Sequence, residues 1–507
     1  MRWDSPVTSR DQLVLFSDRL DLPDDHPARR LDELLQMMSW SNWEQRYRQA
    51  GPGRPPIHPH VMATVLLYGL MKRIRSNRQL EDALRMRLDF RWLAEDRSID
   101  HSTLCNFRRE HGEQLKELFV QIGLVAHGAG LLKLRQLAFD GTRIRANNRR
   151  RGGREVGELK ARKRELEQKF DEFRERADTL DDEDQSSLEL AEEVQDAAAR
   201  LKQISKALDE IERLEQADAA VPKRIPLTDP EARITPNKEG GFSANYTPLA
   251  LVDVDSGMLV NVDVIAETDE KAQLSKALDE TEQQFGEKPE AVLADGLFNH
   301  GTNLGEMEDR GIDLYSPIQF AENNPALRKD LTKSVPSEEW DQLPTKQTSG
   351  EPRLDKQAFI YSEQEDRYYC PWGKKLSFKS ISPEKRSAGT IVERRRYQAN
   401  SKDCQACPLK DRCLSGKKKS FRRLSRDQFD PHRERLAKRM QSDEGQQIYS
   451  QRAPVAERPF AVFKNVMGVR QFLLRGLSNV QTEWRWMATA FNLTKLIRKW
   501  PARAGPT

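Results

Sequence analysis

The chain has 507 residues, 37% of them hydrophobic and 32% charged, so we expect a polar globular protein of two to four domains. No apolar run reaches membrane-spanning length and the N-terminus lacks a signal-peptide pattern, so we expect a cytoplasmic protein with no membrane partner. Five Cys in a reducing compartment argue against a disulfide framework.

Positive charge is concentrated locally, although the net charge is only +4. Residues 141–154 contain six Arg, among them Arg143 and Arg145, and no acid. Residues 458–482 also lack an acid and include Arg458 and Lys464. Such stripes suit a polyanion such as DNA, but a solvated face explains each stripe equally well.

Residues 1–130 are predicted to be all-helical. The apolar spacing places one helix around Leu31–Met38, a second from Val61 and a third near Gln79–Leu93. The turn at residues 51–56, rich in Pro and Gly, separates the first two.

A fourth helix is predicted after Ser102 or Thr103, either of which can cap it. Its first turns carry Arg108 and Arg109. A short turn before a capped helix with early basic residues fits a DNA-reading helix-turn-helix, and ordinary bundle packing fits as well.

The stretch Leu134–Asn147 contains a short apolar run with strand character that ends in Asp140. A carboxylate at the end of a buried strand is costly unless something pairs with it, and a metal ion is the usual partner. The alternative is an ordinary Asp-Gly turn.

Residues 154–216 are charged and free of Pro, with apolar residues spaced by threes and fours on either side of the acidic segment 181–187. This pattern predicts an antiparallel coiled-coil hairpin with arms of roughly 40 Å, at about 1.5 Å per residue. It is either a spacer, or a dimerisation arm or DNA clamp.

Strand signals return after residue 244. Leu249–Val254 and Met258–Ile265 are predicted to form a hairpin, followed by a helix over Glu267–Phe285. A short apolar run at Ala291–Ala294 again ends in a carboxylate, Asp295. This order of elements indicates an α/β domain.

The long polar region that follows has weak strand signals and contains a CxxC pair with two further Cys. Four thiolates from two loops are typical of a tetrahedral Zn²⁺ site, although reduced structural thiols remain an alternative. The fifth Cys, Cys105, is expected to be a core residue. The candidate ligands are Cys370, Cys404, Cys407 and Cys413.

Residues 449–464 are predicted to be helical. Glu457 and Lys464 are seven residues apart and share a helix face, while Phe460 and Phe463 should pack inward. Glu457 lies among basic residues, where a carboxylate is either salt-bridged or a metal ligand near bound phosphates.

These three acids and their surroundings resemble the DDE transposases of bacterial insertion sequences. The resemblance implies an RNase H-like core in which Asp140, Asp295 and Glu457 are the catalytic acids. The family signature of a Tyr, an Arg, the Glu and a Lys is matched by Tyr449, Arg452, Glu457 and Lys464, with the Arg-to-Glu gap one residue longer than in the most familiar subgroup.

By resemblance, the three acids would bind Mg²⁺ or Mn²⁺ ions, which activate a water and then a 3′-hydroxyl for attack on DNA. Tyr449, Arg452 and Lys464 would hold phosphates. The expected partners are double-stranded DNA, both element ends and target, and a second copy of the chain in a homodimer.

The predicted organisation is an α/β chain of five parts: a helical DNA-binding domain (1–130), a first core part (131–153 and 219–322), the coiled-coil hairpin (154–218), a Cys-rich insertion (323–446) and a last core part (447–507). Two alternatives to a transposase are a metal-dependent nuclease without strand transfer and a non-catalytic DNA-binding descendant.

Overall fold

The computed structural model describes residues 22–47, 56–149, 153–177, 185–237, 240–267, 270–318, 324–347, 351–385, 391–414 and 420–499. The chain divides into two compact units. The first unit comprises residues 1–289 and 452–507, and the second comprises residues 290–451. Each is described by itself. Within the described residues, no helix is long and apolar enough to cross a membrane.

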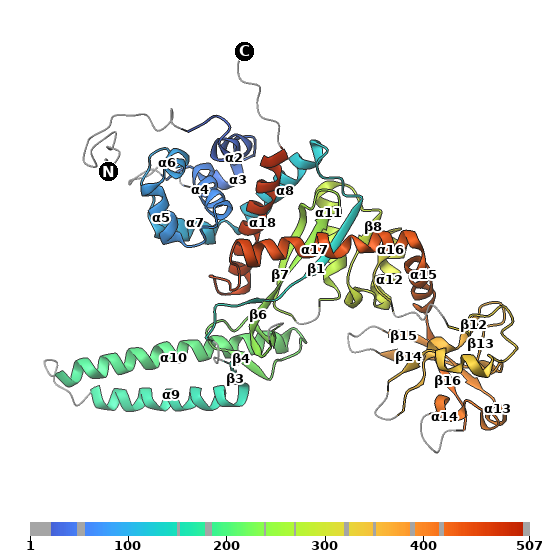
Figure 1. The fold of residues 1–507 in the computed structure, drawn as a ribbon. Helices are drawn as coiled ribbons and strands as arrows, with labels where there is room; N and C mark the ends of the chain where they lie inside the picture. The colour runs from blue at the N-terminus through green and yellow to red at the C-terminus, as the bar shows by residue number, and fades with distance from the viewer. Residues whose placement is uncertain are drawn as a thin grey trace, which may run out of the picture. The chain divides into compact units, whose positions relative to one another are not determined.

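The N-terminal part of the first unit is helical, as predicted (Figure 1). Trp43 and Phe107 are buried against Trp486 of the C-terminal helix α18 (Leu477–Lys499). The helical region therefore shares its core with the C-terminal helix. Its helices are α2 (Pro27–Gln36), α3 (Ser41–Glu44), α4 (Pro59–Met71), α5 (Asn77–Met86), α6 (Leu88–Leu93), α7 (His101–Glu110) and α8 (Gly112–Gly128).

Two local predictions for this region were wrong. The single helix expected over Gln79–Leu93 is broken into α5 and α6, because Arg87 between them is extended, with ψ of 130°. The fourth helix, α7, is capped by Asp100, whose carboxylate accepts the Thr103 N–H at 2.9 Å. An Asp at the N-cap satisfies a backbone donor that has no partner within the helix.

The sheet of the first unit is built on β6 (Phe242–Asp253), a long strand that is almost fully buried. β6 pairs antiparallel with β1 (Gln136–Gly141), β7 (Leu259–Ile265), β2 (Ile144–Arg145) and β5 (Arg233–Pro236). The predicted β6–β7 hairpin is therefore present. The helix expected over Glu267–Phe285 is shorter: α11 begins at Gln273 and ends at Phe285, where Gly286 takes a left-handed conformation with φ of 72°.

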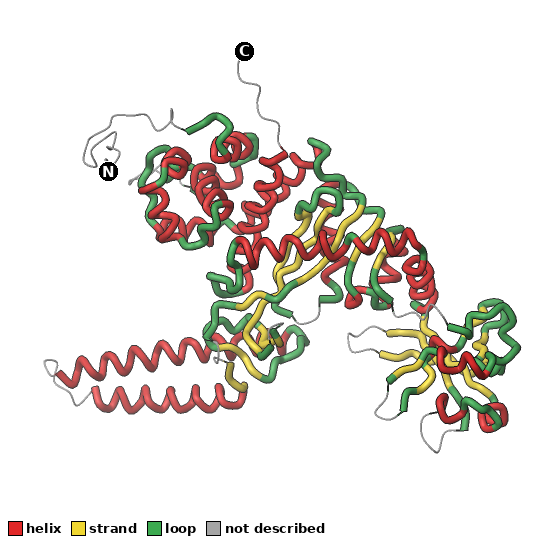
Figure 2. Tube along the Cα trace, viewed as in Figure 1, coloured by secondary structure: helices red, strands yellow, loops and turns green. Residues whose placement is uncertain are grey.

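The charged segment after β1 forms two helices that lie side by side, α9 (Val156–Ala177) and α10 (Gln185–Gln216) (Figure 2). Leu159 and Leu166 of α9 pack with Ile204 and Ile211 of α10, as the apolar spacing predicts. The arms are unequal, about 33 and 48 Å at 1.5 Å per residue, rather than 40 Å each. Leu180 and residues 181–184 lie outside the described residues.

The base of this helical pair is tied to the rest of the first unit. β3 (Gly153–Glu155), just before α9, pairs with β4 (Arg224–Pro226), which follows α10. Glu210 of α10 forms a buried ion pair with Arg233 of β5, with N and O 2.8 Å apart and side chains 6% and 9% exposed. The helical pair is therefore anchored to β5, the strand beside β6.

The second unit has two parts. In one, β8 (Ala291–Leu293) runs parallel to β9 (Asp313–Tyr315), and they are connected through a 3-10 turn, η1 (Gly296–Phe298), and α12 (Gly301–Asp309). α15 (Asp430–Gln441) packs on α12 and is followed by α16 (Asp443–Ser450).

The other part is a five-stranded antiparallel sheet in sequence order, where the sequence showed only weak strand signals. Its core centres on buried Tyr368, Leu376 and Tyr397. Two short helices, α13 (Ser401–Gln405) and α14 (Lys410–Cys413), connect its last two strands along the chain. The strands are β12 (Ile360–Ser362), β13 (Arg367–Tyr369), β14 (Lys375–Lys385), β15 (Ile391–Ala399) and β16 (Arg423–Asp427). Before them in the chain come a two-stranded ladder, β10 (Thr345–Lys346) with β11 (Arg353–Leu354), and two 3-10 turns, η2 (Ser337–Gln342) and η3 (Lys356–Ala358).

Candidate functional site

The end of β1 carries Asp140, and an arginine of α17 (Arg452–Ala461) pairs with it. Arg452 reaches the Asp140 carboxylate with N and O 3.3 Å apart, and the two side chains are only 12% and 14% exposed. The same Asp140 oxygen accepts the Gly141 N–H at 2.9 Å. The strand-end acid predicted from the sequence is thus nearly buried, and a cation from the same unit balances its charge.

α17 is held over β1 and β6 by its apolar face (Figure 1). Ala456, Phe460 and Phe463 are buried, and the two Phe rings pack on Trp484 of α18, with ring centroids 6.1 and 4.5 Å apart. This confirms the prediction that both Phe rings face inward. The packing directs the first turn of α17, with Arg452, toward the end of β1.

Lys464 lies just beyond α17, in a widened turn, η4 (Val462–Val466), of π-helical form. Pro459 inside α17 removes one backbone donor, and the Met467 N–H bonds to the Val462 carbonyl five residues back, at 2.9 Å. From this turn Lys464 Nζ donates to Thr142 Oγ1 at 2.5 Å. Both basic residues of the signature therefore contact the two residues that flank Gly141.

Glu457 lies on α17 between Arg452 and Lys464, and its side chain is exposed. Arg458, the next residue, is also exposed. Ala456 and Pro459 on either side are buried, so the exposed edge of α17 presents Glu457 and Arg458 together. The structure thus places an acid and a base in succession on the same helix edge.

A further carboxylate, Glu270, lies beside the end of β1 and was missed by the sequence analysis. A Cβ atom added to Gly141 would lie 2.7 Å from Glu270 Oε2 and 2.9 Å from Leu249 Cδ2. A side chain at position 141 would therefore force the end of Glu270 or of Leu249 to move. The one available sequence signal was the glycine directly after a strand-end acid, which fits an ordinary Asp-Gly turn equally well.

Asp295 and Tyr449 belong to the second unit. Asp295 follows β8, is half-buried and accepts the Leu297 N–H at 2.8 Å, which caps η1. Its own carbonyl accepts the Ser316 hydroxyl at 2.8 Å. Tyr449 is half-buried in the last turn of α16, next to the start of α17 in sequence.

The predicted DNA-contact arginines have different environments. Arg143 is exposed and donates to the Pro236 carbonyl at 3.0 Å, while half-buried Arg145 lies in β2, beside Gln471. Arg109 is exposed on α7, but Arg108 is 5% exposed and donates to the Arg75 carbonyl at 2.8 Å. The structure therefore does not support a direct DNA contact for Arg108, whose helix face packs inward.

Four of the five cysteines line one pocket of the second unit, here called the thiol pocket: Cys370, Cys404, Cys407 and Cys413. Burial raises the pKa of the Cys407 thiol to about 11 and that of Cys413 to about 12, and the other thiols of the pocket add to both shifts. The four thiols therefore lie within electrostatic reach of one another. Cys105 lies apart, in α7.

The donor chemistry of the three acids fits a hard divalent cation, because Mg²⁺ and Mn²⁺ prefer carboxylate oxygens. Asp140 and Glu457 belong to the first unit and Asp295 to the second. Among the residues that the structure describes, no three His, Cys, Asp or Glu side chains already stand at metal-binding distances. The catalytic ligand set consequently remains a prediction.

Comparison with known protein families gives two matches, and both families are transposases. One, described as a transposase DDE domain, matches residues 369–497; the other, described as a transposase domain (DUF772), matches residues 17–110. No curated protein and no solved structure matches the chain. Both matches support the predicted resemblance of the chain to the DDE transposases of the insertion-sequence type.

The DDE match has one consequence for the organisation of the chain. It begins at residue 369 and continues to residue 497, so it contains the four cysteines of the thiol pocket as well as the signature from Tyr449 to Lys464. The part of the predicted Cys-rich insertion from residue 369 onward therefore lies within the region that matches the family. The match does not reach Asp140 or Asp295.

Proposed function

We propose that this chain binds the terminal inverted repeats of an insertion sequence and catalyses metal-dependent cleavage and strand transfer of DNA. The observation that carries the proposal is the contact of α17 with the end of β1. Arg452 pairs with the predicted first acid, Asp140, and Lys464 donates to Thr142, two residues further along the chain. Two basic residues of the family signature therefore lie at the end of β1.

In this proposal the acids and the bases of the first unit have separate tasks. Asp140 and Glu457, with Asp295 of the second unit, would hold divalent metal, which would supply Lewis-acid activation of water and stabilisation of the leaving oxygen. Arg452, Lys464 and Tyr449 orient the phosphate at the scissile end. Exposed Arg143, Arg458 and Arg109 contact the DNA backbone, which makes binding salt-dependent.

The experiment compares Asp140→Asn, Asp295→Asn and Glu457→Gln with the wild type on a duplex that carries the element's end. Each variant should bind the duplex nearly as well as wild type but lose at least about 1,000-fold in cleavage with Mg²⁺, because loss of a metal ligand removes several kcal/mol of transition-state stabilisation. Asp255→Asn, an exposed acid in the turn between β6 and β7, is the control.

The same assay separates the alternatives. Wild-type cleavage without joining of a pre-cut 3′-hydroxyl end to target DNA would identify a nuclease, and binding without cleavage would identify a non-catalytic DNA-binding protein. Near-normal cleavage by any one acid variant would remove that residue from the site.

We also propose that α9 and α10 contact a second protomer in a homodimeric complex that holds two DNA ends. The support is that Arg143 and Arg145 lie on the chain just before this helical pair, whose base is anchored by the Glu210–Arg233 ion pair. Replacing residues 156–218 by a short Gly-Ser linker should reduce paired-end complexes while single-end binding persists. Unchanged paired-end assembly would show that the helical pair is only a spacer.

A further inference from the structure

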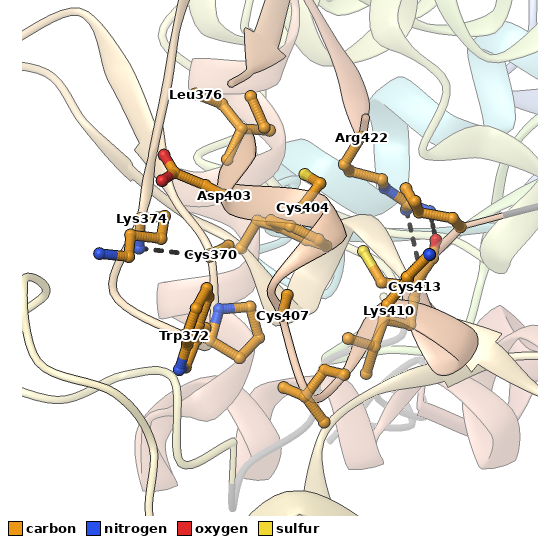
Figure 3. A pocket seen from close by; sticks show the side chains of 16 residues that line it. Cys370, Trp372, Lys374, Leu376, Asp403, Cys404, Cys407, Lys410, Cys413 and Arg422 are labelled. Carbon is orange, nitrogen blue, oxygen red and sulfur yellow. Dashed lines mark hydrogen bonds between the residues drawn. The ribbon is translucent and has the colours of Figure 1, made fainter. Parts of the chain in front are cut away.

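The thiol pocket is not used by the proposed DNA chemistry, so its four cysteines need a separate explanation. The pocket is formed by two chain segments of the second unit. Cys370 follows β13, and the other three lie in the stretch that contains α13 and α14 (Figure 3). Two chain segments that bring four thiols to one pocket are typical of a structural zinc site.

The turn after Cys370 has the backbone form that suits a metal-bound sulfur. The Lys374 N–H donates to Cys370 Sγ at 3.3 Å (Figure 3), and the Gly373 N–H closes the turn on the Cys370 carbonyl at 2.8 Å. Gly373 has φ of 70°, and a Cβ there would lie 2.3 Å from the Thr332 carbonyl oxygen. This turn therefore requires glycine and directs an amide hydrogen at the sulfur, where it stabilises a thiolate.

Charged side chains around the pocket favour a negatively charged centre. Lys374, Lys410 and Arg422 line it, against one acid, Asp403. Arg422 is fixed by donation to the Cys413 carbonyl at 2.8 Å and to the Leu354 carbonyl at 3.0 Å. Four thiolates with one Zn²⁺ carry a net charge of −2, which these cations offset.

The two helices beside the pocket are very short. α13 has five residues and α14 has four, and isolated helices of this length are unstable in water. A metal that joins their cysteines to the β13–β14 turn would fix both short helices on the sheet.

We infer that the thiol pocket binds one structural Zn²⁺ ion, which joins the β13–β14 turn to the α13–α14 segment. In the described structure the thiols do not yet stand at metal-binding distances. The proposed site therefore requires the thiols to turn toward a common centre, and a Cys side chain has three staggered positions about its Cα–Cβ bond. Thiolate ligands select Zn²⁺ over the harder Mg²⁺ proposed for the acids.

The test is metal analysis of the full chain purified under reducing conditions with Zn²⁺ in the growth medium. Wild type should carry about one zinc ion per chain, as expected of a single tetrahedral thiolate site. Cys404→Ser should lose this zinc, whereas Cys105→Ser, the matched control in the first unit, should keep it. Zinc-free, folded wild type, or equal zinc in Cys404→Ser, would overturn the inference.

A second measurement covers the case in which Cys404→Ser does not fold. Wild type is stripped with a chelator and titrated with Co²⁺, which should give the thiolate charge-transfer and tetrahedral d–d bands of a four-thiolate site, lost again on addition of Zn²⁺. Absence of these bands overturns the inference. Neither measurement involves DNA, so its outcome is independent of the proposed transposition chemistry.

Discussion

The end of β1 and the thiol pocket both gather groups that bind cations, but their charges are balanced in different ways. At the end of β1 the chain supplies the cation itself, through Arg452 on Asp140. In the thiol pocket the groups lie among apolar and basic side chains, and burial raises the pKa of Cys407 and Cys413. Without a metal ion these thiols are expected to remain neutral.

The difference follows from what each site must do. A site that binds and releases DNA and metal needs its acid ionised beforehand, and a flexible cation that can transfer from the acid to a phosphate serves that purpose. A structural site works by remaining closed, so its ligands need no internal cation. The first site therefore should fold without metal, and the second should depend on it.

The largest effect on the end of β1 is expected from removing Arg452. Arg452→Ala removes the cation that the structure places on the nearly buried Asp140, so we expect the first unit to lose about 3 kcal/mol of stability at pH 7 and cleavage to fall about 100-fold. Thermal or urea unfolding in the absence of DNA and metal measures the first effect. A loss of cleavage with unchanged stability would mean that Arg452 acts only on DNA.

The control for this prediction is Arg458→Ala on the same helix. Arg458 is exposed, so its removal should change stability by less than about 0.5 kcal/mol. Arg452→Lys keeps the positive charge but loses the planar guanidinium, and should recover part of the stability. Equal destabilisation by all three substitutions would point to helix packing rather than to the Asp140 pair.

A second prediction tests how closely Glu270 and Leu249 approach Gly141 at the end of β1. Gly141→Ala places a Cβ 2.7 Å from Glu270 Oε2 and 2.9 Å from Leu249 Cδ2, so one of them must move. We expect about 1–3 kcal/mol of destabilisation, which is the usual cost of overpacking. Gly128→Ala, where nothing lies within 4 Å of the added Cβ, is the matched control and should be nearly neutral.

Adding Glu270→Ala to Gly141→Ala identifies the group that clashes. If the carboxylate is the obstacle, the double variant should be more stable than the sum of the two single changes predicts, because the substitutions couple. Strict additivity would assign the clash to Leu249, which is 3% exposed and has less freedom to move.

Much of the first unit was predictable because its signals are local. Apolar spacing marked the helical pair, and the Asp-Ser-Gly turn marked the β6–β7 hairpin. The inward positions of Phe460 and Phe463 followed from helical periodicity alone. Asp140 was identified because an acid after an apolar run is unusual, and its partner Arg452 was named without knowledge of their contact.

The features that could not be predicted from the sequence depend on contacts between distant segments. The burial of Arg108 results from packing against Arg75 and α18, which periodicity does not encode. Glu270 lies beside Gly141 only because β6 and β7 bring residues 129 positions apart together. The five-stranded sheet gave only weak strand signals because its core consists of a few Tyr and Leu residues among many charged ones.

The smallest predicted effect concerns the protonation state of Asp229, a buried carboxylate that differs from both sites above. Asp229 is 1% exposed, and its Oδ1 accepts the Tyr246 hydroxyl at 2.9 Å and the Gly476 N–H at 3.1 Å. Burial raises its pKa to about 6, despite both hydrogen bonds. Both hydrogen bonds favour the ionised carboxylate, so it is burial that shifts the balance toward the neutral form in the folded chain.

Because the folded pKa lies above the unfolded value, Asp229 favours the folded state most at low pH, and that contribution is lost as pH rises from about 4 through about 6. Asp229→Asn should therefore remove this decline and leave the chain as stable as wild type, or slightly more so, at pH 7.5. Urea unfolding of both proteins at pH 5 and at pH 7.5 measures the difference. Asp229→Asn that is less stable than wild type at pH 7.5 would show that the carboxylate is ionised in the fold and that Arg475, rather than hydrogen bonding, balances it.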